Sequence, residues 1–335
     1  TRGVYVKYVL DRRGMKFQSA IKKELEKFDK IFPNAFSTKV ALLDLILRYA
    51  VKKKGKRIRP ALVLLSAKAL AGEVTEKTYR GATLVELMHT ATLVHDDVVD
   101  ESMIRRNRFS INALWKNKIA VLIGDYMLSK VLLLAVDHGD HDLLMHISKS
   151  VQLMSEGELL QIEKARKLDI DEETYNDIIS KKTASLISTC CLIGASSVNA
   201  KELQKQWLLK FGYALGLAFQ IQDDLLDYQI YGESGKPTGI DVKEQKMTLP
   251  LIYALKVSSK SDKKKMMQIV RNKKDDPESI SWLMNKVLSL GGMEYARKAI
   301  NKYENEALFY LDKFPESNSK KSLFDLVKFV VKRTN

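Results

Sequence analysis

The sequence predicts an all-α fold in one domain over residues 1–335, and three features support this prediction. First, apolar side chains recur at helical spacing, as at Phe17, Ile21, Leu25 and Phe28. Second, no segment shows the alternation of apolar and polar residues that is typical of a half-buried strand. Third, no Ser-, Gly- or Pro-rich linker divides the chain, and an apolar fraction of 45% is ample for one large core.

The expected helices begin at residues that favour helix boundaries. Thr75 would cap a long helix that ends in an aspartate-rich segment, and Pro60 would take the first position of the helix before it. Ser37 or Thr38 would cap the helix that precedes both. The segment 121–136 is apolar nearly all round, so it is expected to be a core helix. The other helices are expected over 15–30, 39–51, 60–71, 142–165, 171–193 and 201–228, and from residue 249 onward with breaks at 275–277, 291–292 and 315.

The aspartate-rich segment reads HDDVVDESMIRR and holds the first candidate site residues, Asp96, Asp97, Asp100, Arg105 and Arg106. Asp96 and Asp100 are four residues apart, so on a helix they share a face and repel each other unless a cation lies between them. Mg²⁺ suits such hard oxygen ligands, and it commonly binds one or two carboxylates together with substrate phosphates. The arginines would donate to phosphate oxygens. The alternative is a solvated acidic helix end followed by a basic loop.

A second segment repeats the pattern Asp-Asp-two apolar-Asp on a later helix, at Asp223, Asp224 and Asp227. Phe219 and Leu225 are among its apolar neighbours, and burial of carboxylates beside such residues is costly unless they are paired or bind a metal. Two such clusters are difficult to explain as solvated faces, so the sequence predicts a metal-diphosphate site shared by two helices.

Basic residues at helix boundaries are candidates for binding an anionic ligand. Lys56, Arg57 and Arg59 crowd the start of the helix at Pro60, where the helix dipole already favours anions. An exposed basic turn is the alternative. His89 lies two turns before Asp97, and it is either a phosphate ligand or a satisfied core histidine.

The segment 231–246 is rich in glycine and carries Lys236 and Lys246. Beside a metal site such a segment is typical of a lid, and the alternative is an ordinary connector. On the preceding helix Gly212 and Gly216 are one turn apart, which predicts a close approach of another helix or of a ligand.

Composition narrows the function classes. The net charge of +15 is compatible with nucleic acid, an anionic membrane or an anionic substrate. No basic stripe with interleaved aromatic residues occurs, which argues against nucleic acid. Two adjacent cysteines form no disulfide framework, and no stretch looks like a signal peptide or a membrane-spanning helix. We therefore expect a cytoplasmic protein.

The motifs GKRIRP, DDVVD followed by RR, KKT, FQIQDD and GKPTGID occur in this order. With them the chain resembles the trans-isoprenyl (E-type) diphosphate synthases over nearly its whole length. The segment HTATLVHDDVVDESMIRRN is most similar to the long-chain branch that makes octaprenyl or solanesyl products. The resemblance implies an all-helical bundle around a deep central cavity, the isoprenoid synthase fold, and a homodimer.

The resemblance also implies a role for each matching residue. Isopentenyl diphosphate would be bound by Lys56, Arg59, His89 and Arg106. The allylic diphosphate would be bound by Arg105, Lys182, Thr183, Gln220, Lys236 and Lys246. Mg²⁺ would be ligated by Asp96, Asp100 and Asp223, with Asp97, Asp224 and Asp227 acting through water or through a neighbouring ligand. The reaction would begin with ionisation of the allylic substrate, continue with attack by the alkene of isopentenyl diphosphate, and end with loss of a proton to the released diphosphate.

Product length would be set by the cavity beneath the first aspartates. Ala91 and Thr92 are small, whereas family members with short products carry bulky aromatic residues there. Met88 lies deeper, about 12 Å along the helix from Asp96, so the expected product has about thirty to fifty carbons. Leu132 occupies a position where some long-chain members carry Phe as the floor of the tunnel, which leaves the stopping point open.

Two other functions are weighed against this one. A class I terpene cyclase shares the fold and the metal chemistry, but it typically has a different second metal motif and no need for Lys56 and Arg59. A non-catalytic helical subunit of a heteromeric synthase would be expected to have degraded aspartate motifs, and both motifs are intact here. The basic surface further suggests peripheral contact with an anionic membrane during product release.

Overall fold

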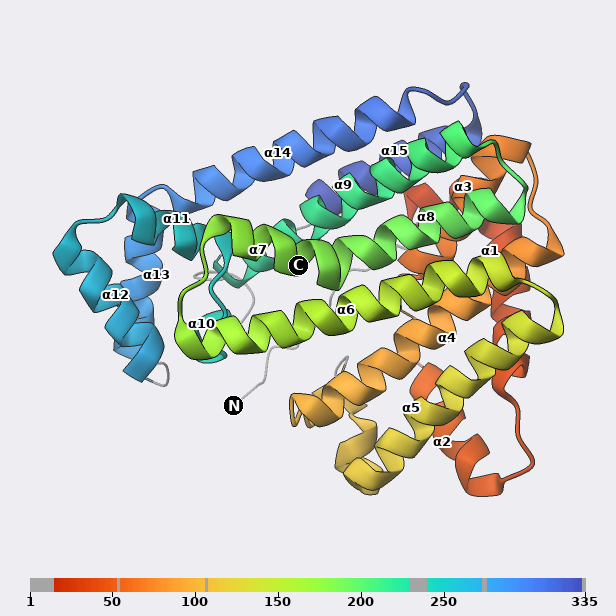
Figure 1. Cartoon of the computed structure of the whole chain (residues 1–335), viewed down its shortest axis with the longest axis horizontal. Coiled ribbons are helices and arrows are strands. Elements are labelled where there is room, and N and C mark those ends of the chain that lie inside the picture. Colours follow the sequence, from red (N-terminus) through yellow and green to blue (C-terminus); the bar gives the residue numbers. More distant parts are fainter. Residues whose placement is uncertain (1–14, 53–54, 106–107, 229–239, 273–275, 333–335) are drawn as a thin grey trace, which may run out of the picture.

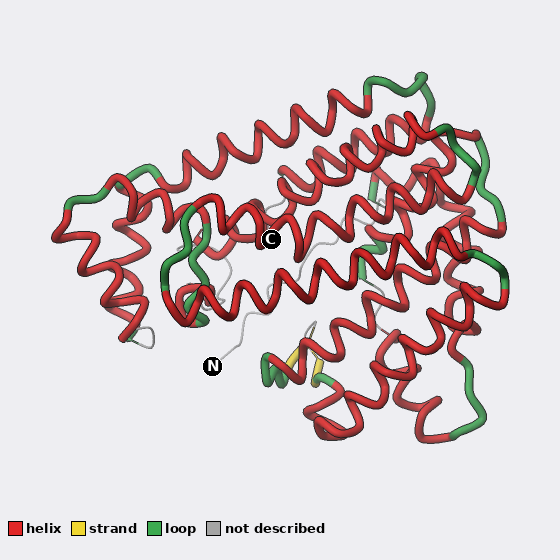
Figure 2. The backbone as a smooth tube through the Cα atoms, in the orientation of Figure 1, coloured by secondary structure: helices red, strands yellow, loops and turns green. Residues whose placement is uncertain are grey.

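The computed structural model describes residues 15–52, 55–105, 108–228, 240–272 and 276–332, and this part of the chain is almost entirely helical (Figures 1 and 2). The α-helices are α1 (Lys22–Ile31), α2 (Ala41–Lys52), α3 (Ile58–Ala71), α4 (Glu76–Val99), α5 (Ile111–Asp137), α6 (His141–Lys167), α7 (Glu172–Ile179), α8 (Ser185–Ser197), α9 (Glu202–Tyr228), α10 (Ile240–Lys243), α11 (Leu249–Val257), α12 (Lys260–Asn272), α13 (Pro277–Ser289), α14 (Gly292–Leu311) and α15 (Asn318–Val331). The 3₁₀ segments η1 (Lys16–Ile21) and η2 (Phe32–Phe36) flank α1, and the π-helical turn η3 (Ser180–Ala184) joins α7 to α8. The all-α prediction is confirmed.

Within the described residues, strands occur in one short hairpin between α4 and α5. Strand β1 (Ile104–Arg105) pairs antiparallel with β2 (Arg108–Phe109), and Arg105 lies opposite Arg108.

Long helices lie side by side (Figure 1). The two aspartate clusters lie at the C-terminal ends of α4 and α9. Helix α8 packs between α3 and α9, α4 packs on α5, and α14 covers α9. Gly212 and Gly216 allow the contact between α9 and the α7–α8 segment, because a Cβ atom at these positions would lie 2.6 Å from the Cα of Ser188 and 2.5 Å from the Cα of Ala184. The predicted close approach of a helix is therefore confirmed.

The helix boundaries follow local chemistry, with three corrections to the prediction. Thr75 caps α4 in a capping box with Thr78, as expected. Helix α3 begins at Ile58, so Pro60 is its third residue; the first-turn N–H groups have no acceptor within a helix, which makes this place equally tolerable. Helix α2 begins two residues later than predicted, at Ala41. The expected helix over 171–193 is interrupted by η3.

The prediction that 121–136 is a core helix was wrong for one face of α5. Ile123, Met127 and Val131 are buried, whereas large apolar side chains on the opposite face are exposed: Val121, Leu122, Leu132, Leu133 and Val136. The expectation that no helix is long and apolar enough to span a membrane was also wrong. Among the described residues Ile111–Asp137 and Glu172–Ser197 reach that length and composition. The second is mostly buried, which is typical of a core helix, whereas the first is mostly not.

Lys116 lies at a kink within α5 with φ 71° and ψ 161°. Residues with a Cβ atom rarely adopt these backbone angles, so any residue other than glycine is strained there.

Candidate active site

The two aspartate clusters border one common space. Asp96 interacts electrostatically with Lys182 and Glu158, which come from η3 and α6. Asp100 interacts with Lys246, and Lys246 also interacts with Asp241 beside the second cluster. The cations Lys182 and Lys246 therefore lie between the acidic ends of α4 and α9, as a shared diphosphate site requires.

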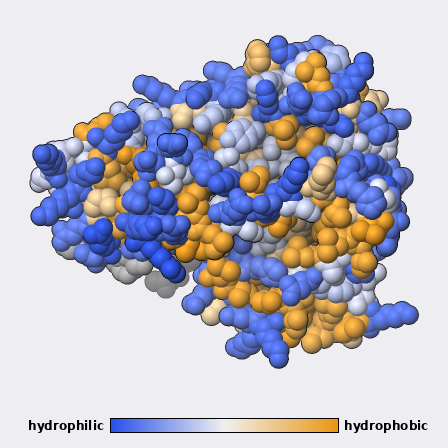
Figure 3. Space-filling view, in the orientation of Figure 1, coloured by the Kyte–Doolittle hydropathy of each residue, from blue (hydrophilic) through white to orange (hydrophobic). Residues whose placement is uncertain are grey.

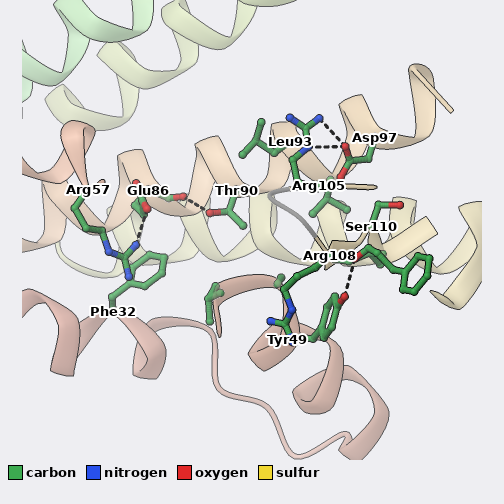
Figure 4. A pocket seen from close by; sticks show the side chains of 15 residues that line it. Phe32, Tyr49, Arg57, Glu86, Thr90, Leu93, Asp97, Arg105, Arg108 and Ser110 are labelled. Carbon is green, nitrogen blue, oxygen red and sulfur yellow. Dashed lines mark hydrogen bonds and ion pairs between the residues drawn. The ribbon is translucent and has the colours of Figure 1, made fainter. Parts of the chain in front are cut away.

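In the first cluster the central aspartate is the buried one. Asp97 accepts hydrogen bonds from the Nε and Nη2 atoms of Arg105, at 2.7 and 2.5 Å (Figure 4). The side-chain amide of Asn112 donates to the backbone carbonyl of Asp97 at 3.1 Å. Asp96 and Asp100, one helical turn apart, remain open to solvent in part. Burial and the charge of Glu158 raise the pKa of Asp96 to about 6, and burial raises the pKa of Asp100.

In the second cluster, too, the central aspartate is buried, but its hydrogen-bond donors are neutral. The Tyr175 hydroxyl donates to one carboxylate oxygen of buried Asp224 at 2.6 Å, and the Gln220 amide donates to the other at 2.8 Å. The Thr183 hydroxyl then donates to the Gln220 carbonyl oxygen at 2.6 Å. Burial raises the pKa of Asp224 to about 6. Because the Thr183 proton is engaged, this hydroxyl presents oxygen lone pairs to the pocket that Lys182, Gln220 and Asp224 also line.

Two acidic residues, Asp241 and Glu158, belong to the site but were not predicted from the sequence. The Asp227 carboxylate accepts a hydrogen bond from the backbone N–H of Asp241 at 3.1 Å, which ties α10 to the second cluster. Burial and the charges of Asp224 and Asp227 raise the pKa of Asp241 to about 7. Glu158 on α6 forms an ion pair with Lys182. The motif GKPTGID contains Asp241, so the sequence held a signal for it, whereas Glu158 is brought in only by the packing of α6.

The π-helical turn η3 positions Lys182 and Thr183. A Cβ atom at Gly157 of α6 would lie 2.9 Å from the Cβ of Lys181 and 3.1 Å from the backbone N of Lys182. This glycine therefore lets α6 approach η3 closely, and π-helical turns are frequent at functional sites.

The predicted ligands of isopentenyl diphosphate lie on α3, α4 and the segment before α3. The Lys56 ammonium lies 5.0 Å from the ring centroid of Phe329 on α15, Arg59 is in the first turn of α3, and His89 is buried on α4. Arg106 lies outside the described residues, as does Lys236 with most of the expected lid over 231–246. The roles of these five residues stay predictions.

The comparisons with known proteins agree with this geometry. The family model for polyprenyl synthetases matches residues 40–287 of the chain. This protein belongs to the polyprenyl synthetase family. It is 33% identical to the all-trans-nonaprenyl-diphosphate synthase of Rhodobacter capsulatus over 93% of this chain and 96% of the relative, and 32% identical to the octaprenyl diphosphate synthase of Escherichia coli over 88% and 91%.

Solved structures place this polyprenyl synthetase in the same fold. A decaprenyl diphosphate synthase from Rhodobacter capsulatus superposes with a TM-score of 0.90 at 33% identity, over 96% of this chain and 99% of that one. A polyprenyl synthase from Caulobacter crescentus, solved with calcium and isoprenyl diphosphate, has a TM-score of 0.88 at 27% identity over 96% and 98%. The predicted isoprenoid synthase fold and the assignment to the long-chain trans-prenyltransferases are therefore confirmed.

Of the residues expected to set product length, those on α4 are buried or half-buried, whereas the one on α5 is exposed. Met88 and Ala91 are fully buried on α4, and Thr92 is half-buried with its hydroxyl donating to the His89 carbonyl at 3.0 Å. Leu132 is 53% exposed on the outer face of α5, away from the face that packs on α4. Leu132 is therefore not enclosed within one chain, and its role at the floor of a tunnel stays a prediction. The reason is that α5 leaves one apolar face uncovered.

The acidic clusters of this polyprenyl synthetase suit a divalent cation that is completed by substrate. Within the described ranges, no three His, Cys, Asp or Glu side chains converge closely enough to enclose an ion by themselves. Burial is the main cause of the raised pKa values of Asp96, Asp224 and Asp241, and neighbouring carboxylates add to it. A cation that takes one or two carboxylates from each helix, with phosphates and water, fits this donor set.

Proposed function

We propose that this polyprenyl synthetase adds isopentenyl diphosphate units to an allylic diphosphate and makes a long-chain all-trans polyprenyl diphosphate. The observation that carries the proposal is the shared space between the two clusters, with Lys182 and Lys246 between them. Such a site binds a diphosphate with its metal ions and stabilises negative charge as that diphosphate leaves. The names of the relatives support a long product.

One set of residues would stabilise the leaving diphosphate, and another would stabilise the allylic cation. Asp96, Asp100 and Asp223 would hold Mg²⁺, which supplies Lewis-acid stabilisation of the leaving diphosphate when bound. Arg105, Lys182 and Lys246 bind the phosphate oxygens as the allylic C–O bond breaks. The oxygen lone pairs of Thr183, oriented by Gln220, face the allylic cation. The alkene of isopentenyl diphosphate then forms the new C–C bond, and the released diphosphate takes the proton that is lost.

A second candidate has a specific observation in its favour. The heptaprenyl diphosphate synthase component 2 of Bacillus subtilis is 30% identical over 95% of this chain and 91% of that protein, and its name makes it one component of a synthase. The present chain, too, would then need a partner chain for activity. A class I terpene cyclase has no comparable observation in its favour.

One assay separates these functions. The purified chain is incubated with Mg²⁺ and an allylic diphosphate, with and without isopentenyl diphosphate, and diphosphate release is measured. A synthase releases diphosphate only with both substrates, whereas a cyclase requires only the allylic one. A component or a non-catalytic subunit releases none alone, and that result would overturn the proposal that this chain suffices.

The buried position of Ala91 supports a long product. Replacement of Ala91 by Phe would fill the space beneath Asp96 and should shorten the product distribution, read by chromatography of the dephosphorylated products. An unchanged distribution would show that the tunnel does not pass Ala91.

We further propose that the chain forms a homodimer through α5 and α6. Apolar side chains gather over this part of the surface (Figure 3) and include Leu122, Leu132, Leu133, Val136, Met145 and Leu159. An exposed apolar patch of this kind is typical of an interface. Light scattering should give twice the chain mass of 38.1 kDa, and Leu133→Glu should give the monomer. A monomeric parent protein would contradict the proposal.

Two further proposals concern location. Both cysteines are buried and unpaired, which supports a reducing, cytoplasmic compartment. The net charge of +15 supports peripheral contact with anionic membranes during product release. Sedimentation with anionic vesicles tests the contact, and absence of salt-sensitive binding would contradict it.

A further inference from the structure

A second pocket lies on the other side of α4, between α2 and the β1–β2 hairpin (Figure 4). Its walls from α4 are Glu86, Thr90, Leu93, Val94 and Asp97. These residues recur at helical spacing on a face next to the one that carries Asp96 and Asp100. The pocket is therefore separate from the space between the aspartate clusters and shares with that site only the pair of Asp97 and Arg105.

The body of the pocket is apolar. Phe32 of η2, Val51 of α2 and Ile111 of α5 line it together with Leu93. An apolar chain in this space would be removed from water on several sides, which is favourable in proportion to the area buried.

Three arginines border this apolar body, and two of them are neutralised. The Arg57 guanidinium donates to Glu86 at 2.6 Å and lies 3.2 Å from Asp29. Arg105 is held by Asp97, as described above. Arg108 differs, because among the described residues no carboxylate pairs with it, and its guanidinium stacks 4.8 Å from the ring centroid of Tyr49.

The β1–β2 hairpin places Arg105 and Arg108 side by side. Arg105 and Arg108 are directly opposite in the β1–β2 register, and like charges in such a pair are destabilising. Asp97 compensates one of the two positive charges. One uncompensated cation therefore remains at the rim of an apolar pocket, which is the arrangement that suits one anionic head group with an apolar chain.

We propose that this pocket binds an amphipathic anion, with its head group at Arg108 and its apolar chain along Val51, Leu93 and Phe32. The proposal goes beyond the proposed function, because it assigns a second ligand site. Arg105 lies at the partition between the two sites, so occupancy of the pocket would be communicated to the diphosphate site through the Arg105–Asp97 pair.

Trp115 provides a local reporter that requires no turnover. Its ring packs edge-on against Tyr49, which lines the pocket, with centroids 5.1 Å apart. The other tryptophans, Trp207 and Trp282, lie on α9 and α13 and would be replaced by Phe. Titration of this single-tryptophan protein with decyl phosphate, below its micelle concentration, then measures binding at the pocket alone. Decanoate, decanol and inorganic phosphate are titrated in parallel.

The expected result is saturable quenching or a spectral shift with decyl phosphate or decanoate, and the stronger of the two identifies the head group. Arg108→Gln should weaken this binding about tenfold or more. Ala50→Phe, which fills the pocket from α2, should abolish it. Arg48→Gln is the matched control, because Arg48 is an exposed arginine of α2 that pairs with Asp44 outside the pocket. Thermal unfolding verifies that each variant is folded.

Three results would overturn the proposal. They are equal binding by the parent and Arg108→Gln, equal binding by decanol and decyl phosphate, and no response of Trp115 to any of the amphiphiles. None of these measurements depends on prenyl transfer. They would therefore still test binding at the pocket if the proposed function were wrong.

Discussion

The two aspartate clusters have the same sequence pattern, and in both the second aspartate is the buried anchor. Asp97 and Asp224 turn into the protein, while Asp96 and Asp223, which precede them, are only half-buried. The anchors differ in their partners. Asp97 is held by the cation of Arg105, whereas Asp224 is held by the neutral donors of Tyr175 and Gln220.

This difference assigns each cluster a separate task. On a helix, residues i and i+4 share a face, and residue i+1 points about 100° away from residue i. The pattern Asp-Asp-two apolar-Asp therefore supplies two outward ligands and one inward anchor. Under the proposed function the first anchor would orient Arg105, which would bind phosphate. The second would orient Gln220 and Thr183 toward the developing cation.

The largest expected effect comes from loss of the outward aspartates. Asp96→Asn and Asp223→Asn each remove a carboxylate that would bind the metal-diphosphate unit, so each should lower kcat about 10³-fold or more. Steady-state rates of diphosphate release, measured at saturating Mg²⁺, provide the comparison. Asp169→Asn, a change at an exposed aspartate outside both clusters, serves as the control. Turnover near the wild-type rate in either variant would remove the basis of the enzyme assignment.

A smaller effect should distinguish the two anchors. Asp97→Asn releases Arg105 and should raise KM for the allylic diphosphate. Tyr175→Phe removes one hydrogen bond to Asp224 and should lower kcat, with KM little changed. Groups that orient ligands in this way typically contribute about 10–100-fold to activity.

A matched control exists for the tyrosine. The hydroxyl of Tyr126 on α5 donates to the backbone carbonyl of Ser37 at 3.3 Å, away from both aspartate clusters, so Tyr126→Phe should leave both constants unchanged. If Asp97→Asn and Tyr175→Phe changed the same constant to the same extent, the division of tasks between the clusters would be wrong.

The all-α fold and the outward-facing aspartates could be predicted from the sequence, because both depend on local periodicity. Thr75, Asp96 and Asp100 could be assigned from spacing along one helix. Tyr175 and Glu158 could not, since only the packing of α6 and α7 brings them to the aspartates.

The exposure of Leu132 could not be predicted for a related reason. A run of apolar residues shows that a helix is hydrophobic, but it does not show which face has a neighbour in the same chain. Asp241 was within reach of sequence reasoning, because it ends the motif GKPTGID, yet its contact with Asp227 depends on the path of α10.

Removal of the Asp241 carboxylate beside the second cluster should change only the thermal stability, and only modestly. In the metal-free protein the pKa of Asp241 is raised to about 7, above its value in the unfolded chain of about 3.9. Its favourable contribution to stability is therefore complete below that lower value and is lost as pH rises through about 7. Asp241→Asn should accordingly raise the metal-free Tm at pH 8 by about 2–4 °C, and by less at pH 5.

Magnesium and a second aspartate provide controls for the effect of Asp241→Asn on Tm. Under the proposed function Mg²⁺ would bind the ionised clusters, so it should raise the wild-type Tm more at pH 8 than at pH 5. Asp262 is the control of opposite sign, because its hydrogen bond to Lys286 lowers its pKa and Asp262→Asn should lower Tm at pH 8. If Asp241→Asn instead lowered the metal-free Tm at pH 8, the carboxylate would be a net stabilising partner of α10. The second cluster would then not be a site of uncompensated negative charge that awaits a cation.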